Sequence, residues 1–376
     1  MIIYWSMLLL IVLTALMTTQ YQIKKYGDTL STRKVKIHPI IPWIVFGYII
    51  FFIGFRNMGG DTWLYIFSFN NLSTNQSISG ILGNQNIKGP VFTILELLIK
   101  RYISNQYYFF LFFVAAVSGI CIMKLLYKYS DYFFYSVFLF MCTGTVVWMM
   151  NGIRQFLAVC IIAAGFDWLL KGKTVKYILL ILFASTIHNT AIIMIPIYFV
   201  IRCKPWSKKL ILFILLTAVI CMFMGQFTTI LSDSLEATTY ANAANELANG
   251  SGQGTNYLRV LVACIPTIFA LMFRRKIEAK SDHKIDMLIN LSVVTSCFSI
   301  LGMFSNGILV GRMPIYFSIY NLILLPWIFN NVFKKRDGLL VKFICGILYL
   351  IYFYYQMVIT WNMYYGSDFL RMSVHF

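Results

Sequence analysis

Long apolar segments, separated by shorter polar ones, run along the whole chain. A helix needs about 20 predominantly apolar residues to cross a bilayer core of about 30 Å. The pattern therefore predicts an all-α fold, a polytopic integral membrane helical bundle of about 11–12 membrane segments in one transmembrane domain over 1–376. The apolar runs lie near 2–19, 39–55, 107–127, 132–150, 153–170, 177–201, 210–231, 257–273, 285–304, 309–330 and 340–360.

Composition excludes a soluble globular domain. The chain is 60% hydrophobic and 12% charged, whereas soluble chains are roughly 45–50% apolar and about 25% charged. The first residues, MIIYWSMLLLIVLTALMTTQ, have no basic n-region, so we read them as a retained first span. The eight cysteines are scattered, mostly within apolar runs, and form no CxxC or Cys/His cluster. They are typical of buried free thiols, and we expect no metal and no cofactor.

The charge balance of +18 raises the question of a nucleic-acid partner. If the N-terminus is outside and the spans alternate, 23 of the 31 basic residues fall in one set of connections, at 20–38, 124–128, 171–176, 202–209, 274–284 and 334–342. Basic residues gather in cytoplasmic loops, so this set is predicted to be cytoplasmic. Topology then explains the charge, and no nucleic acid is required. The remaining eight lie on the outer side: Arg56, Lys88, Lys100, Arg101, Arg154, Arg259, Arg312 and Arg371.

The run 177–201 has basic residues on both flanks. A single crossing would place one flank outside, but 25 residues give only about 37 Å of helix, too little for two full crossings. We therefore predict a short re-entrant hairpin that enters from the cytoplasm and turns near His188–Asn189. One tilted span is the alternative. Non-helical backbone at that depth is tolerated only where protein surrounds it or a cavity adjoins it.

Two outer segments are long. Residues 56–106 contain the amphipathic stretches TWLYIFSFNNL and GPVFTILELLIKRYI, which are typical of helices lying at the membrane interface. Residues 232–256 are polar, with three acids and no Lys or Arg. We expect the second segment to be a flexible loop able to cover a site from outside.

Candidate chemistry comes from charges on the outer side, which the positive-inside bias does not explain. In GFRNMGGDTWLY, Arg56 follows a span, and Asp61 and Tyr65 would share a helix face. The glycine pair allows a sharp turn or a close approach to a ligand. The structural alternative is that Asp61 caps the helix TWLYIF while Arg56 reaches the headgroups.

Further along the chain, Arg154 and Gln155 open a helix at its outer end. Ionisable groups in membrane segments point to a cavity and a partner, which is the reading we favour for Arg154; the alternative is an arginine anchored in the outer headgroups. We expect Asp167 to pair with Lys171 at i+4. His188 suits a proton-transfer or phosphate role, or that of a hydrogen-bonded core histidine.

Arg312 is followed by Tyr316 at i+4 on a helix near the C-terminal part of the chain. Several outer arginines with a carboxylate and a histidine make an anion site at the membrane–water boundary. A lipid diphosphate is the ligand this chemistry indicates.

The motifs R-x4-D-x3-Y (Arg56, Asp61, Tyr65), NGIRQFLAV, the run K-x2-K-Y-x-LL…IH-x-TA and the late GRMPIYF together resemble EpsG-type proteins, which belong with the Wzy-like bacterial polysaccharide polymerases. The resemblance implies a glycosyltransferase that joins oligosaccharide repeat units carried on undecaprenyl diphosphate, at the outer face of the cytoplasmic (inner) membrane. The product would be O-antigen, capsule or exopolysaccharide. Implied partners are that lipid-linked oligosaccharide, the bilayer, a chain-length regulator and a flippase of the same pathway.

Set against that chemistry, Arg154 and Arg312, with Arg56, would clamp the leaving diphosphate, and Gln155, Tyr65 and Tyr316 would complete the diphosphate and sugar site. Asp61 and His188 are the catalytic candidates: Asp61 would orient Arg56 or the acceptor, and His188 would lie at the acceptor. Two other functions stay open, a lipid-linked oligosaccharide flippase and a membrane O-acyltransferase. A flippase would be expected to have internal repeats, and an acyltransferase an early Arg/His pair.

Overall fold

The computed structural model describes residues 1–26, 37–84, 87, 89–226, 254–305 and 310–374. These residues are mainly helical, with one two-stranded sheet among them, and the predicted all-α class is confirmed. Within this part of the chain four helices are long and apolar enough to cross a membrane, at Ile2–Tyr21, Tyr107–Tyr129, His283–Phe304 and Arg336–Thr360. Shorter apolar helices accompany them, as a multi-pass protein requires. The number of crossings and the outside N-terminus stay predictions.

The chain forms two compact units. Unit 1 comprises Met1–Ile192 with Leu339–Phe376, and unit 2 comprises Ile193–Gly338. Unit 1 is built from these helices: α1 (Ile2–Tyr26), α2 (Ile40–Gly54), α3 (Thr62–Asn71), α4 (Ile78–Gly83), α5 (Pro90–Tyr102), α6 (Tyr107–Tyr129), α7 (Phe133–Cys142), α8 (Ile153–Ala164), α9 (Phe166–Leu170), α10 (Thr174–Ile187) and most of α20 (Lys335–Tyr354). Short 3₁₀ helices follow α7 at Thr145–Met149 and α10 at Asn189–Ile193, and a π-helix follows α20 at Tyr355–Thr360.

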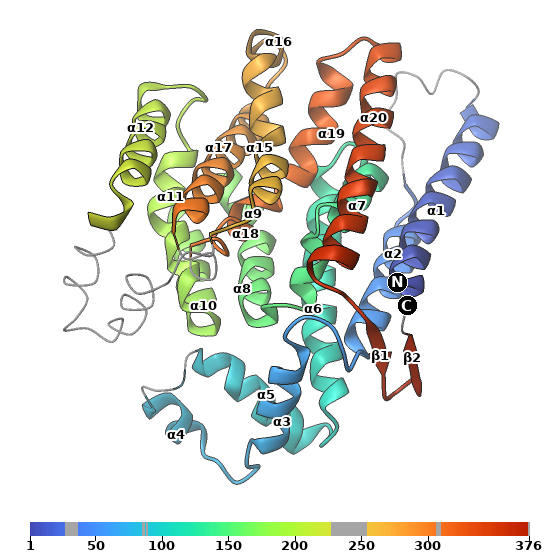
Figure 1. Cartoon of the computed structure of the whole chain (residues 1–376), viewed down its shortest axis with the longest axis vertical. Helices are drawn as coiled ribbons and strands as arrows, with labels where there is room; N and C mark the ends of the chain where they lie inside the picture. The colour runs from blue at the N-terminus through green and yellow to red at the C-terminus, as the bar shows by residue number, and fades with distance from the viewer. Residues whose placement is uncertain (27–36, 85–86, 88, 227–253, 306–309, 375–376) are drawn as a thin grey trace. The chain divides into compact units, whose positions relative to one another are not determined.

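Helices α2, α6, α8 and α10 pack side by side in unit 1, as Figure 1 shows. Polar side chains of interest lie at the two ends of this group of helices. The start of α6 meets the end of α2, where a side chain on Gly54 would strike Phe112. The start of α8 and the end of α10 lie at this same end, which we call the α3–α5 end because helices α3 to α5 cover it. A cluster of functional groups drawn from distant segments is therefore placed at one end of unit 1.

The opposite end of unit 1 carries described lysines of the predicted cytoplasmic set, among them Lys128, and we call it the basic end. There the Tyr127 hydroxyl donates to the carbonyl oxygen of Ile37 (3.2 Å), and Lys128 forms an ion pair with Asp167. The predicted ion pair between Asp167 and Lys171 is wrong: the ion pair is with Lys128 of α6, and Lys171 acts on Asp167 only electrostatically. The separation of the two ends within unit 1 is the one that the positive-inside pattern requires.

In the described part of segment 56–106 the chain forms α3, α4 and α5, and the two stretches predicted to be helical, TWLYIFSFNNL and GPVFTILELLIKRYI, contain α3 and α5. Gly89 precedes helix α5 as its N-cap residue, with a φ of +80° that suits glycine, and Pro90 occupies the first helical position, where proline is favoured. Near its end, Lys100 donates to the carbonyl oxygens of Phe69 (2.7 Å), Asn70 (2.8 Å) and Leu72 (2.8 Å), which caps the end of α3.

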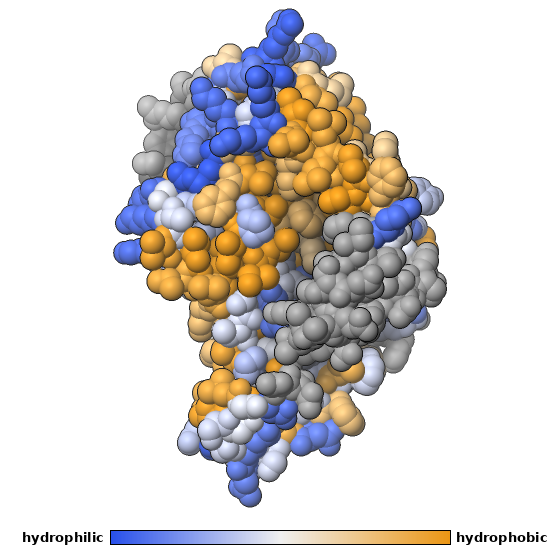
Figure 2. Space-filling model, turned by 90° about the vertical axis from the view of Figure 1, so that its left-hand side faces the viewer, coloured by the Kyte–Doolittle hydropathy of each residue, from blue (hydrophilic) through white to orange (hydrophobic). Residues whose placement is uncertain are grey.

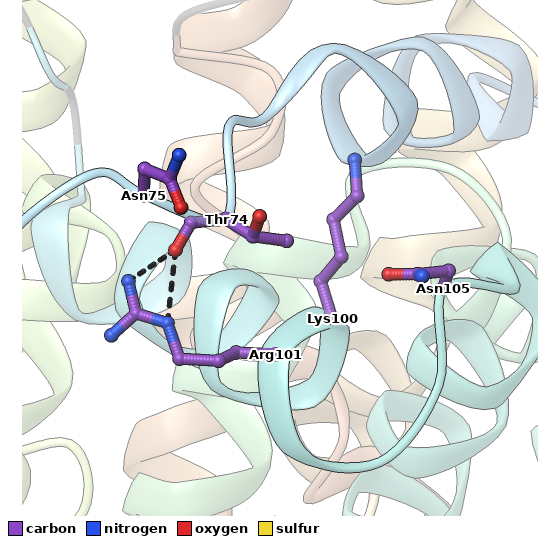
Figure 3. Close-up of a pocket in the computed structure, with 5 residues that line it drawn as sticks. All are labelled: Thr74, Asn75, Lys100, Arg101 and Asn105. Carbon is purple, nitrogen blue, oxygen red and sulfur yellow. Dashed lines mark hydrogen bonds between the residues drawn. The ribbon is translucent and has the colours of Figure 1, made fainter.

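Arg101, the next residue of α5, fixes the chain beyond α3. Its guanidinium turns to the carbonyl oxygen of Thr74, with Nε at 2.9 Å, and also donates to that of Gln76 (2.9 Å) (Figure 3). Lys100 and Arg101 line a pocket of about 550 Å³ with Thr74, Asn75 and Asn105. Both cations thus have structural partners, which accounts for their presence on the predicted outer side.

The end of the chain returns to the turn after α2 as a hairpin of β1 (Tyr365–Ser367) and β2 (Met372–Val374), paired antiparallel. The backbone N–H of Asn57 donates to the Gly366 carbonyl oxygen (2.7 Å), and the Phe369 ring stacks on the Phe55 ring with centroids 4.1 Å apart. Asp368 accepts hydrogen bonds from Asn57 and Tyr107. The hairpin therefore fixes the segment that carries Arg56.

Unit 2 is organised around α17 (His283–Phe304), most of whose residues are buried. Asn290, fully buried on α17, donates to the carbonyl oxygens of Ile201 (2.9 Å) and Cys203 (2.6 Å). The exposed side chains on α12 include Leu212 and Leu215. Figure 2 views this side of the molecule and shows apolar surface, with hydrophilic surface towards the top of the view. Around α17 are α11 (Met194–Ile201), α12 (Lys208–Met222), α15 (Tyr257–Met272), α16 (Arg274–Glu278), α18 (Ile315–Ser318) and α19 (Asn321–Asn331).

The run 177–201 breaks where the sequence predicts. Helix α10 ends at Ile187, His188 is extended (φ −147°, ψ 114°), and a short 3₁₀ turn leads into α11. At 14 residues α10 is about 21 Å long, less than the bilayer core. The re-entrant course itself stays a prediction, and most of the predicted flexible loop 232–256 lies outside the described residues.

Candidate functional site

Arg56 lies at the centre of the turn between α2 and α3, and its side chain is 1% exposed. Its Nε donates to the Thr62 hydroxyl (2.8 Å) and its Nη1 to the Ile53 carbonyl oxygen (2.6 Å). Asp61 and Tyr65 are close enough to interact electrostatically with it. Arg56 is therefore not a headgroup anchor: in this conformation it holds the turn together, and its predicted contact with substrate stays a prediction.

Asp61 lies at the N-cap position of α3, but its side chain makes no capping hydrogen bond there. Instead the amide of Gly152 donates to both carboxylate oxygens, at 3.0 and 2.9 Å. The structural alternative, a side-chain cap on TWLYIF, is therefore wrong. The carboxylate interacts with the start of α8, where the helix dipole favours negative charge. The close approach needs Gly60, whose φ is +58° and where an added Cβ would lie 2.6 Å from the Met150 carbonyl oxygen.

Arg154 and Gln155 occupy the first turn of α8, directly beyond the amide that Asp61 binds. The half-buried Arg154 guanidinium lies over the Phe92 ring of α5, 5.9 Å from its centroid. Gly89 allows this packing: an added Cβ would lie 3.2 Å from Arg154 Cδ and 2.3 Å from the Ile187 carbonyl oxygen. A cation–π contact orients the guanidinium while leaving part of it accessible to an anion.

His188 joins this end of unit 1 from α10. Its Nδ1 and the Thr190 hydroxyl are 2.7 Å apart, and Gln155 Nε2 donates to the same hydroxyl at 3.4 Å. The half-buried imidazole is thus connected to the first turn of α8 through one threonine. Tyr65 of α3 packs edge-on against Phe92, with centroids 5.9 Å apart. Six of the eight predicted site residues therefore lie at the α3–α5 end: Arg56, Asp61, Tyr65, Arg154, Gln155 and His188.

Glu96 is a candidate that the sequence reading missed. It lies on α5 one turn beyond Phe92 and is 2% exposed. The Ser68 hydroxyl donates to Oε2 (3.2 Å), whereas Oε1 is buried with no hydrogen-bond partner among the described residues. Burial raises the Glu96 pKa to about 7, against the opposing effects of Ser68, Arg154 and Lys100. The available signal was an acid within the leucine-rich face of the amphipathic stretch VFTILELLIKRY.

Arg312 and Tyr316 belong to unit 2. Arg312 is half-buried in the turn before α18, and Tyr316 in α18 is 1% exposed. Their participation in one site with Arg154 stays a prediction. Within the described residues no group of three or more His, Cys, Asp or Glu side chains is placed to hold a metal ion.

The α3–α5 end of unit 1 therefore combines a partly accessible arginine, a helix N-terminus with its carboxylate, a histidine and a buried acid of raised pKa. Perturbed acids beside a cation are typical of functional sites. Such a set can bind an anion and accept a proton beside it.

Comparison with known proteins gives one match. The model of the EpsG family matches residues 40–366, which include every predicted site residue. No curated protein and no solved structure matches the chain. The match covers most of the chain and agrees with its apolar helices and with the resemblance of its motifs. The chain belongs to the EpsG family, as a multi-pass membrane protein of polysaccharide biosynthesis with a polymerase-type function.

Proposed function

We propose that this protein is a glycosyltransferase that joins oligosaccharide repeat units carried on undecaprenyl diphosphate, at the outer face of the bacterial inner membrane. The product is a surface polysaccharide of the O-antigen, capsule or exopolysaccharide type. A flippase that delivers the lipid-linked units and a regulator of chain length are the partners this reaction needs.

The placement of Arg154 carries the proposal. It lies at the end of unit 1 opposite the basic end, in the first turn of α8 and against the Phe92 ring. Guanidinium groups bind phosphate oxygens bidentately, and a helix N-terminus adds amide donors and a favourable dipole. A diphosphate whose lipid tail stays in the bilayer can reach such a position from the membrane.

The reaction breaks the bond between the anomeric carbon of the growing chain and the diphosphate oxygen, which keeps the electron pair. The acceptor hydroxyl oxygen bonds to the same carbon and loses its proton. Arg154 neutralises the charge that develops on the leaving diphosphate, with Arg312 as its predicted second cation. Asp61 holds the start of α8, and His188 lies beside the acceptor sugar, oriented through Thr190.

A deletion strain tests this function. Lipid-linked single repeat units should accumulate at the outer face, and the intact gene should restore long chains. Absence of any unit at the surface would instead indicate a flippase, and chains of normal length lacking acyl groups would indicate an acyltransferase.

The role of Arg154 is tested in the same strain. Arg154→Ala should shorten or abolish the polymer, because one interaction with developing charge is worth about 10²–10³ in rate. Arg274→Ala is the control: this arginine is exposed on α16 and pairs with Glu278 at i+4, so its loss should leave chain length unchanged. Full-length polymer from Arg154→Ala would exclude Arg154 from the site.

A further inference from the structure

The contact between Ser68 and Glu96 is not explained by the helix packing that surrounds it. Glu96 is an acid buried on α5, and one of its carboxylate oxygens has no hydrogen-bond partner among the described residues. Such an arrangement lowers the stability of the fold, so its presence calls for a functional explanation. Ser68, its hydrogen-bond partner on α3, is exposed. The pair therefore connects the surface of the α3–α5 end with a buried carboxylate.

The Ser68–Glu96 pair lies directly beside the proposed diphosphate site. Ser68 is three residues after Tyr65 on α3, and Glu96 is four residues after Phe92 on α5, so each lies about one turn, or 5.4 Å, along its helix. Tyr65 contacts Phe92, and the Arg154 guanidinium lies over the Phe92 ring. The proposed anion-binding group, Arg154 against Phe92, therefore lies about one helical turn from the hydroxyl of Ser68 and the carboxylate of Glu96.

We propose that Ser68 and Glu96 form the proton-accepting pair for the acceptor sugar, an assignment that rests on the proposed function. The acceptor hydroxyl gives its proton to Ser68 Oγ as its oxygen bonds to the anomeric carbon, and Ser68 passes its own proton to the Glu96 carboxylate. The electron pair of the broken bond leaves with the lipid diphosphate. Glu96 afterwards returns the proton to solvent, so the exposed hydroxyl meets substrate while the acid stays buried.

The surroundings of Glu96 suit this role. The charged groups that act on it are Arg154 and Lys100. Among the helices packed against α5, α3 contributes Tyr65, α6 contributes Tyr107 and Tyr108, and α4 has no titratable side chain. His188 directly follows the end of α10. A carboxyl group with a pKa of about 7 is the most effective kind of base at neutral pH, because it is both ionised and basic enough.

The test uses purified full-length protein in nanodiscs, with lipid-linked repeat units as substrate and undecaprenyl diphosphate as the binding probe. Glu96→Gln should lower the rate about 10²–10⁴-fold, the usual contribution of a general base, while the probe still binds. Formate should raise the rate of Glu96→Gly at least tenfold, because a small carboxylate replaces a proton acceptor but not a packing group. Ser68→Ala should also be slow, with Ser68→Thr restoring the rate.

Two controls separate the possible failures. Ser77→Ala, which removes a helix cap on the nearby α4, should keep the wild-type rate. The wild-type rate should rise with pH to a plateau above about 7, a rise that Glu96→Gln loses and His188→Asn keeps. A wild-type rate in Glu96→Gln, or no formate response in Glu96→Gly, overturns the proton-accepting role. A wild-type protein that neither polymerises nor binds the probe overturns the proposed function itself.

Discussion

Replacing Glu96 by Gln should make the protein more stable at neutral and alkaline pH. Burial raises the pKa of this carboxyl group from 4.5 to about 7 in the folded protein. At about 1.36 kcal/mol per pKa unit, ionising it in place costs about 3 kcal/mol more than ionising it in the unfolded chain. The isosteric amide keeps the volume of the side chain and carries no charge, so it avoids this cost.

The sign and the pH window follow from the two pKa values. Between pH 4.5 and about 7 the folded state binds more protons at Glu96 than the unfolded state does. The free energy of unfolding of the wild type therefore falls as pH rises through this window and levels off above it. The advantage of Glu96→Gln should be small at pH 4.5 and approach about 3 kcal/mol at pH 8.

Reversible unfolding in mixed micelles, followed from pH 4.5 to 8, measures this difference. Glu278→Gln is the matched control: it makes the same chemical change at a half-exposed acid on α16, where loss of a surface ion pair should change stability by less than about 1 kcal/mol. Parallel wild-type and Glu96→Gln curves, or a Glu96→Gln protein that is less stable at pH 8, would refute the assignment of a raised pKa to this buried acid.

Two further predictions concern the contact between the α2–α3 turn and α8. Asp61→Asn should lower the free energy of unfolding by about 1–2 kcal/mol and reduce polymer length, because the Gly152 amide loses a charged acceptor at a helix N-terminus. Asp167→Asn, at an exposed ion pair, should alter neither quantity. Gly60→Ala should reduce the thermal midpoint and the yield of folded protein, since its φ is +58° and a carbonyl oxygen lies 2.6 Å from the added Cβ. Gly47→Ala should leave both unchanged, because nothing lies within 4 Å of its added Cβ.

The fold class follows from the sequence because it depends on local composition. Apolar runs of helical length predict α2, α6 and α17 to within two residues at each end, and α1 at its start but not at its end. The extended residue His188 interrupts the run 177–201 where the two basic flanks predict a break. Helices α3 and α5 are visible as amphipathic stretches, whereas α4 was not predicted. Within a membrane, backbone polar groups must be satisfied inside each segment, so hydropathy alone specifies most of the secondary structure.

The partners within the site do not follow from local spacing. The i+4 rule placed Asp61 and Tyr65 on one helix face and paired Asp167 with Lys171. In the structure the Asp61 carboxylate accepts hydrogen bonds from the Gly152 amide, and the ion pair of Asp167 is with Lys128. Helix packing supplies both of these partners. Spacing along the chain identifies which polar residues need a partner, and the tertiary fold determines which partner they have.

The described cations on the predicted outer side show how burial separates structural roles from functional ones. Lys100 and Arg101 donate hydrogen bonds to backbone carbonyl oxygens near the end of α3, and Arg56 is buried within its turn. In this conformation the charged groups of these three residues are therefore engaged in holding the fold together. Arg154 is half-buried, its guanidinium lies over the Phe92 ring, and its charge acts on the buried Glu96, whose ionisation is expected to lower stability. An arrangement that lowers stability is expected where function requires it, which makes the Arg154–Glu96 neighbourhood the part of this end to test first.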